Sequence, residues 1–196
     1  MLETTQFLGR LRVETRPEHD AIEAVLDLTG VHMTRDSYRR TLEHFYGYYQ
    51  PFEVAVRAVH DWVGYGLDLD QRRKTPLLES DLRALGVDSL DSIPMWHIAP
   101  RLNRLAEAFG YLYVTEGATL GGQLISRHVS QTIGVMPERG GRFFYGYGDQ
   151  TGRMWQTFRT ALAAFATTRD TQDQVVAAAV QTFRTLRAWC EQRQAE

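Results

Sequence analysis

Apolar residues recur at intervals of three and four along almost the whole chain, a spacing that places them on one face of a helix. No pair of alternating strands is recognisable. We therefore expect an all-α fold, a bundle of about six or seven helices that forms a single domain over residues 1–196. The helical segments are expected at 4–27, 34–63, 76–85, about 100–134, 151–168 and 171–193.

Prolines and glycines mark where these helices stop or bend. Pro17 falls inside the first segment, and Thr15 and Glu18 have the spacing of a capping box. Either a new helix starts at Thr15, or one helix is kinked at Pro17. The stretches 87–99 and 137–150 are expected to be irregular, because the first has Pro94 within it and Pro100 just after it, and the second is rich in glycine.

Length and charge exclude several classes of protein. A chain of 196 residues fits one ordinary domain, and a net charge of −2 argues against general nucleic-acid binding. No apolar run approaches the roughly 20 residues that cross a membrane, and the N-terminus carries charge where a signal peptide is apolar. A single cysteine, Cys190, excludes an intrachain disulfide. We expect a cytoplasmic protein that binds neither nucleic acid nor membrane.

His19 stands out among the six histidines. It lies on the apolar face of the first predicted helix, with Arg16 and Arg12 one and two turns earlier. One interpretation is a core histidine beside surface arginines. The other is a heme ligand, because neutral imidazole binds heme iron and arginine pairs with carboxylates such as the heme propionates. The remaining histidines are expected in loops, on helix surfaces or without a function: His32, His44, His60, His97 and His128.

Three glycines within six residues, Gly117, Gly121 and Gly122, interrupt the segment 100–134. A glycine inside a helix costs about 0.5–1 kcal/mol relative to alanine, so this cluster needs a reason. Close packing of two helices, a helix break, and contact of the backbone with a flat ligand are all possible reasons. Other chemistries lack their motifs: the chain has no Glu-x-x-His, no His-Glu-x-x-His, no phosphate-binding glycine loop and no serine nucleophile elbow.

Two motifs resemble those of heme oxygenases. Thr15-x-x-x-His19-x-x-x-Glu23 resembles the proximal-helix signature of that family. The distal helix of the family is similar to Tyr111-Leu112-Tyr113-Val114-x-Glu116-Gly117-x-Thr119-Leu120-Gly121-Gly122-x-x-Ile125-x-Arg127-His128. Together with Gly141-Arg142-Phe143-Phe144 and Trp155-x-x-Phe158, this segment is similar to the bacterial heme oxygenases associated with phytochromes. The resemblance covers most of the chain.

The resemblance implies a heme oxygenase-like helical bundle that holds heme between a proximal and a distal helix. Heme is then both cofactor and substrate. With O2 and electrons from an external donor, such as a ferredoxin or a reductase, it is cleaved to biliverdin, carbon monoxide and ferrous iron. The phytochrome-type resemblance favours the IX-alpha isomer of biliverdin and suggests a bacteriophytochrome as its acceptor.

The same resemblance assigns roles to individual residues. His19 is the iron ligand, and the backbone of Gly117, Gly121 and Gly122 contacts the distal side of heme. Tyr113 is a pocket wall or a propionate contact. Ala118 stands where mammalian-type enzymes have an aspartate that organises distal water, which leaves Arg127 or a backbone carbonyl for that task. The arginines expected near the propionates are Arg12, Arg16, Arg153 and Arg159.

Three alternatives remain at this stage. The first is a heme carrier or sensor without enzymatic activity on the same fold. The second is a different enzyme on that fold, resembling thiaminase-type or cofactorless oxidase relatives, which the position of Cys190 near the C-terminus fits poorly. The third is a structural helical module, which leaves the glycine cluster unexplained.

Overall fold

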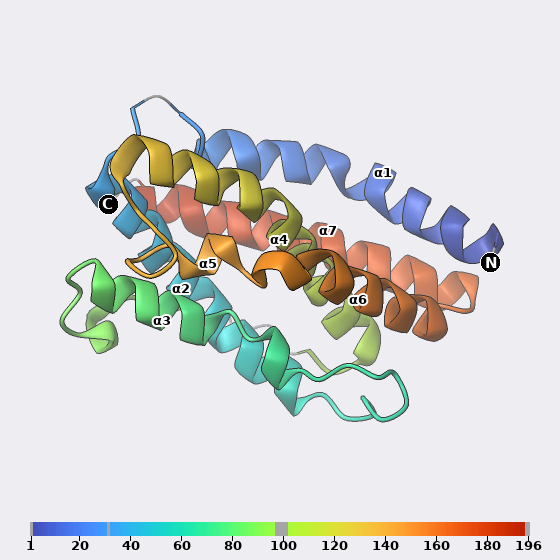
Figure 1. Cartoon of the computed structure of the whole chain (residues 1–196). Helices are drawn as coiled ribbons and strands as arrows, with labels where there is room; N and C mark the ends of the chain where they lie inside the picture. Colours follow the sequence, from blue (N-terminus) through green and yellow to red (C-terminus); the bar gives the residue numbers. More distant parts are fainter. Residues whose placement is uncertain (1, 31, 97–101, 195–196) are drawn as a thin grey trace.

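The computed structural model describes residues 2–30, 32–96 and 102–194, and within these ranges it contains helices and no β-strand (Figure 1). This confirms the all-α prediction. Short 3-10 helices lie at Asp70–Arg72, Leu90–Ser92 and Gly148–Gln150. The α-helices are α1 (Leu2–Leu26), α2 (Arg35–Ala58), α3 (Thr75–Ala84), α4 (Leu105–Ile133), the four-residue α5 (Arg142–Tyr145), α6 (Thr151–Phe165) and α7 (Arg169–Gln194).

Helix α7 packs extensively against α4 and α1 and also touches α2, whereas α1 and α4 do not pack extensively on each other in the described part of the chain. Gly110 allows the closest of these approaches, because a Cβ at this position would overlap Ala178 of α7. Figure 1 shows α1 and α7 running side by side, with α2 and α3 at the opposite side of the molecule. The long helices α1 and α4 therefore both pack on α7 and make few contacts with each other.

Helix α1 is one continuous helix that contains Pro17. The predicted restart at Thr15 is wrong, because the Thr15 hydroxyl donates to the Leu11 carbonyl at 2.8 Å instead of capping a new helix. Thr15 is buried, so this hydrogen bond inside the helix also satisfies a polar group in the core. His19 consequently sits on the same rigid element as Arg12 and Arg16.

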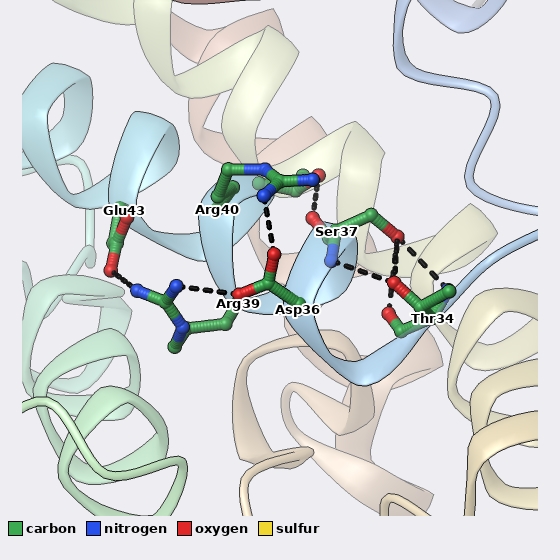
Figure 2. Close-up of polar contacts among 7 residues, drawn as sticks. Thr34, Asp36, Ser37, Arg39, Arg40 and Glu43 are labelled. Atoms are coloured by element: carbon green, nitrogen blue, oxygen red, sulfur yellow. Dashed lines mark hydrogen bonds and ion pairs between the residues drawn. The ribbon is translucent and has the colours of Figure 1, made fainter.

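Helix α2 begins with a reciprocal cap (Figure 2). The Ser37 amide donates to the Thr34 hydroxyl at 3.1 Å, and the Thr34 amide donates to the Ser37 hydroxyl at 3.0 Å. Asp36 in the first turn accepts hydrogen bonds from two arginines of the following turn, Arg39 and Arg40. Carboxylates at this end of a helix are favoured by its dipole. These contacts fix the start of α2 at the position that the sequence predicted.

The predicted end of this helix at residue 63 is wrong, since α2 ends at Ala58. Val63 continues the apolar spacing of the helix but is 96% exposed. The core instead uses aromatic side chains from earlier in α2. The rings of Tyr48 and Phe52 stack at 4.3 Å, and Phe52 stacks on Tyr111 of α4 at 5.0 Å. None of the described helices is both long and apolar enough to cross a membrane.

Helix α5 lies within the stretch 137–150, for which the sequence predicts a loop. Its first turn is held by Asp81 of α3, which accepts the Arg142 amide at 2.9 Å and the Phe143 amide at 2.7 Å. Burial raises the pKa of Asp81 to about 6, and the hydrogen bonds from these two amides limit the increase. The other side of α5 packs against α4. This short helix therefore connects α3 to the helix that carries the glycine cluster.

Candidate functional site

His19 lies on α1 with its side chain 45% exposed. Its Nδ1 is 3.5 Å from Glu23 Oε2 and 3.7 Å from Asp20 Oδ1 but makes no hydrogen bond. The ring packs edge-on against Phe183 of α7, with centroids 5.6 Å apart. Because Nδ1 is on the side of the two carboxylates, Nε2 is the nitrogen that an external metal can reach. Glu23 is placed to orient the imidazole, as carboxylates do for histidine ligands.

Helix α4 presents an open face at Gly117 and Gly121. A Cβ at Gly121 would meet nothing within 4 Å, and one at Gly117 would meet only the Trp155 ring, at 3.8 Å. Since α4 is unbroken from Leu105 to Ile133, the helix-break explanation is wrong. Close packing of helices is also wrong for these two glycines. Contact of the backbone with a ligand is the explanation left for them.

Leucines border the two open glycines. Leu120 and Leu124 lie one turn from Gly117 and Gly121 along α4, and they are 45% and 60% exposed. Large exposed apolar side chains that adjoin one another mark a binding surface more often than isolated ones do. The helix thus shows a flat apolar strip, suited to a planar apolar group.

Gly122 differs from its two neighbours in the cluster. A Cβ on Gly122 would lie 2.7 Å from the carbonyl oxygen of Phe144 in α5. Packing against α5 is by itself enough to require glycine at this position. The predicted contact of Gly122 with heme therefore stays a prediction, and the structure gives the residue a packing role.

Tyr113 brings α4 and α1 together. Burial raises the pKa of its phenol, and the neighbouring Thr15 hydroxyl and Arg12 guanidinium partly offset that increase. Tyr113 also lies 5.9 Å from Trp155 of α6, measured between ring centroids. Side chains from α1, α4 and α6 therefore meet at one end of the open glycine face.

The four predicted arginines have different partners. Arg16 is exposed and pairs with Asp20 at 2.6 Å, whereas Arg153 donates to the Gln150 side chain at 2.9 Å. Arg12 and Arg159 make no ion pair with any described residue. Arg159 follows Trp155 by one turn on α6, and Arg12 is next to Tyr113. These two are the arginines most available to an anionic ligand.

The other histidines are each placed as follows. His32 and His60 are exposed, as predicted, but His44 is buried on α2, so its predicted surface position is wrong. Its place on the buried aromatic face of α2 accounts for the error. His128 has an Nε2 atom that is buried without a hydrogen bond. His97 lies outside the described residues.

A buried ionic cluster that no sequence motif predicts lies directly behind Gly117. We call Arg72, Lys74, Glu116 and Tyr147 the Glu116 cluster. The fully buried Glu116 carboxylate accepts hydrogen bonds from Arg72, from Lys74 at 2.9 Å and from Tyr147 at 2.6 Å. Burial lowers the pKa of Lys74, while Glu116 opposes that change. A glutamate amid the apolar residues of α4 was the one available signal, because its partners lie more than thirty residues away.

Comparison with known proteins identifies the family of the chain. The family model described as heme oxygenase matches residues 5–192, so the chain belongs to the heme oxygenase family. The chain is 33% identical over 98 residues to a heme oxygenase of Xanthomonas campestris pv. campestris, a match that covers 49% of this chain. The matched region spans only 54% of that relative's own length.

Solved structures share the fold over nearly the whole chain. The NO- and CO-bound heme oxygenase of Neisseria meningitidis superimposes with a TM-score of 0.83 at 19% identity, covering 96% of this chain and 92% of that one. Heme oxygenase 1 of Synechocystis, solved in complex with heme, gives a TM-score of 0.73 at 15% identity, with coverage of 96% and 92%. At such identities these likenesses establish the fold alone.

Proposed function

We propose that this chain is a heme-degrading oxidoreductase that cleaves heme to biliverdin, carbon monoxide and ferrous iron. The observation that carries the proposal is the combination of an available imidazole on α1 with an open glycine face on α4. The family of the chain and its fold support the same conclusion. The proposed reaction needs no side chain of the protein as a nucleophile.

The residues present fit heme. His19 Nδ1 is buried without a hydrogen bond beside Glu23, which leaves Nε2 to hold the iron. The absence of side chains at Gly117 and Gly121 leaves room that a Cβ would fill. Bound heme would supply an iron at which O2 is reduced by electrons from an external donor, and its porphyrin ring would be the group that is oxidised. The leucines at positions 120 and 124 exclude water from the ring edge.

Orientation of the ring is the main task of the side chains. The carboxylates of Glu23 and Asp20 lie beside Nδ1 of His19, and Phe183 packs against the edge of the imidazole. Arg12 and Arg159 bind the propionates by charge-assisted hydrogen bonds, which sets the rotation of the ring about its axis. The backbone of Gly117 and Gly121 then lies against one sector of the ring. That sector determines which bridge of the macrocycle is opened.

The finer parts of the proposal follow the resemblance to phytochrome-associated enzymes. The product is the IX-alpha isomer of biliverdin, and a bacteriophytochrome is its acceptor. A ferredoxin or a reductase supplies the electrons. The enzyme acts in the cytoplasm as a single domain, residues 1–196, and contacts neither nucleic acid nor membrane.

The test is aerobic turnover of the heme-loaded protein with a reductant, followed by chromatography of the product. A biliverdin absorbance with one dominant isomer is expected. Retention of intact heme under the same conditions would instead identify a carrier or sensor.

The propionate assignment has its own test. Arg12→Gln and Arg159→Gln should each weaken heme binding or broaden the isomer pattern, because each removes a charged partner of a propionate. Arg83→Gln is the matched control, since Arg83 lies on α3 and pairs with Glu79. Unchanged heme affinity and an unchanged isomer pattern in both site variants would contradict the assignment.

A further inference from the structure

The Glu116 cluster lies immediately behind two residues that line the site. Glu116 precedes Gly117 in α4, and Met154 precedes Trp155 in α6. Gly117 and Trp155 are themselves neighbours, because a Cβ on Gly117 would be 3.8 Å from the Trp155 ring. A contact that joins Glu116 to Met154 therefore affects the distance between Gly117 and Trp155.

Arg72 makes that connection with one guanidinium. One of its terminal nitrogens donates to Glu116 Oε2, and the other donates to the Met154 carbonyl oxygen at 3.3 Å. Arg72 belongs to the 3-10 helix before α3 and is 5% exposed. The guanidinium is planar and holds its donors in a fixed fork, so it transmits a defined spacing between its two acceptors. No single lysine amine has this geometry.

The other members of the cluster satisfy the second carboxylate oxygen. Lys74 and Tyr147 both donate to Glu116 Oε1 and to no atom of α6. Two cations thus share one fully buried carboxylate. Buried ion pairs contribute little net stability, and in some proteins they are retained for structural specificity. This cluster fits that role, because it lies between helices whose relative position shapes a ligand site.

A small cavity next to the cluster completes the environment of Arg72. It has a volume of about 20 Å³ and is lined by Arg72, Glu53, Tyr111 and Thr115 among others. Arg72 Nε, Glu53 Oε2 and the Tyr111 hydroxyl are all buried without a hydrogen-bond partner in the protein. A cavity of this size holds one water molecule, which can satisfy several of these atoms.

We propose that Arg72 is a positioning residue that fixes the spacing between Gly117 of α4 and Trp155 of α6 and thereby the orientation in which heme is held. This inference rests on the proposed function, since heme is the ligand that is oriented. Arg72 acts through Glu116 and the Met154 carbonyl and does not touch the ligand itself.

The test compares Arg72→Lys with Tyr147→Phe. Arg72→Lys keeps the charge but loses the fork that spans α4 and α6, whereas Tyr147→Phe removes one hydrogen bond from the same carboxylate and leaves the span intact. We expect Arg72→Lys to weaken heme binding about tenfold and to broaden the isomer pattern, as substitution of supporting residues commonly does. Tyr147→Phe should leave both properties unchanged. Arg72→Gln, which also removes one buried cation, gives a second variant should the first fail to fold.

Hydrogen exchange of the heme-free proteins separates positioning from general stability. Amides of residues 117–124 and 154–159 should exchange faster in Arg72→Lys than in Tyr147→Phe at equal melting temperature. Equal exchange in these segments, or equal loss of heme affinity in the two variants, would overturn the proposal. Failure of the wild-type protein to degrade heme would defeat the proposed function, while the exchange comparison would still decide whether Arg72 fixes the two helices.

Discussion

The glycines of α4 serve two opposite purposes. Gly110 and Gly122 are glycines because α7 and α5 lie where a side chain would be. Gly117 and Gly121 have room for a Cβ, so packing does not require glycine there. All four carry the same conformational cost in a helix. A glycine that packing does not require is therefore the more informative one, because only something outside the chain explains it.

The largest expected effect on heme binding is at His19 of α1. His19→Ala should abolish the absorption spectrum of histidine-ligated heme and with it the turnover, because the iron loses its proposed ligand. His60→Ala is the control, because His60 is exposed in the segment that follows α2. A normal heme spectrum and normal turnover in His19→Ala would refute the whole assignment of the site.

Substitutions at the two packed glycines of α4 should destabilise the folded protein. Gly110→Ala and Gly122→Ala force a methyl group into the backbone of a neighbouring helix, which should reduce the free energy of unfolding by about 1–3 kcal/mol. Gly9→Ala on α1 is the control, since a Cβ there meets nothing within 4 Å. Urea unfolding of the three heme-free variants measures the difference. Equal stability of the three variants would mean that positions 110 and 122 tolerate a side chain.

The attachment of α5 to α3 should depend on pH through Asp81. Because the pKa of Asp81 is raised to about 6 by burial, the folded state takes up its proton more readily than the unfolded chain. The contribution of this group is complete below about pH 4, the unfolded pKa, and is lost as pH rises through about 6. Relative to Asp81→Asn, the wild-type protein should lose about 1–2 kcal/mol between these limits.

Unfolding of both proteins at pH 4 and pH 7 tests this expectation. A stability difference between wild type and Asp81→Asn that does not change with pH would show that Asp81 keeps its ordinary pKa.

The smallest effect on stability is expected at Gly121, and it is a gain instead of a loss. Gly121→Ala should stabilise the heme-free protein by about 0.5–1 kcal/mol, as alanine does inside a helix, because nothing lies within 4 Å of the new methyl group. The same methyl group should weaken heme binding. Gly9→Ala should give the same gain in stability with unchanged heme affinity. Unaltered heme affinity in Gly121→Ala would mean that heme does not require the open face of α4 to lack a side chain.

Much of the fold was predictable because it depends on local patterns. The start of α2 follows from its cap, and the bounds of α3 and α7 follow to within two residues from apolar periodicity. Pro17 leaves two alternatives open in the sequence, because a proline inside a helix resembles a proline near its start until the bonding of Thr15 is known. Val63 was misjudged because apolar spacing can continue past the point where the chain leaves the core.

The site was predictable only in part, for a related reason. His19 and the glycine cluster are each contained in one helix, so sequence spacing identifies them. Which glycines face open space depends on α5 and α7, which reach α4 only in the folded chain. Arg72 and Glu116 are separated by 44 positions, and no local pattern links them. Burial of His44 is likewise decided by its neighbours in space.

Cys190 has a practical consequence for studying this chain. It is fully buried, and burial raises the pKa of its thiol to about 12. At neutral pH only about one thiol in 10⁵ is then ionised, so alkylating reagents that attack thiolates react with it very slowly. A cysteine introduced at Leu124, which is 60% exposed, would be the one readily labelled thiol of the native protein. A fluorophore attached there would report the arrival of a ligand on α4 without any native cysteine having to be removed.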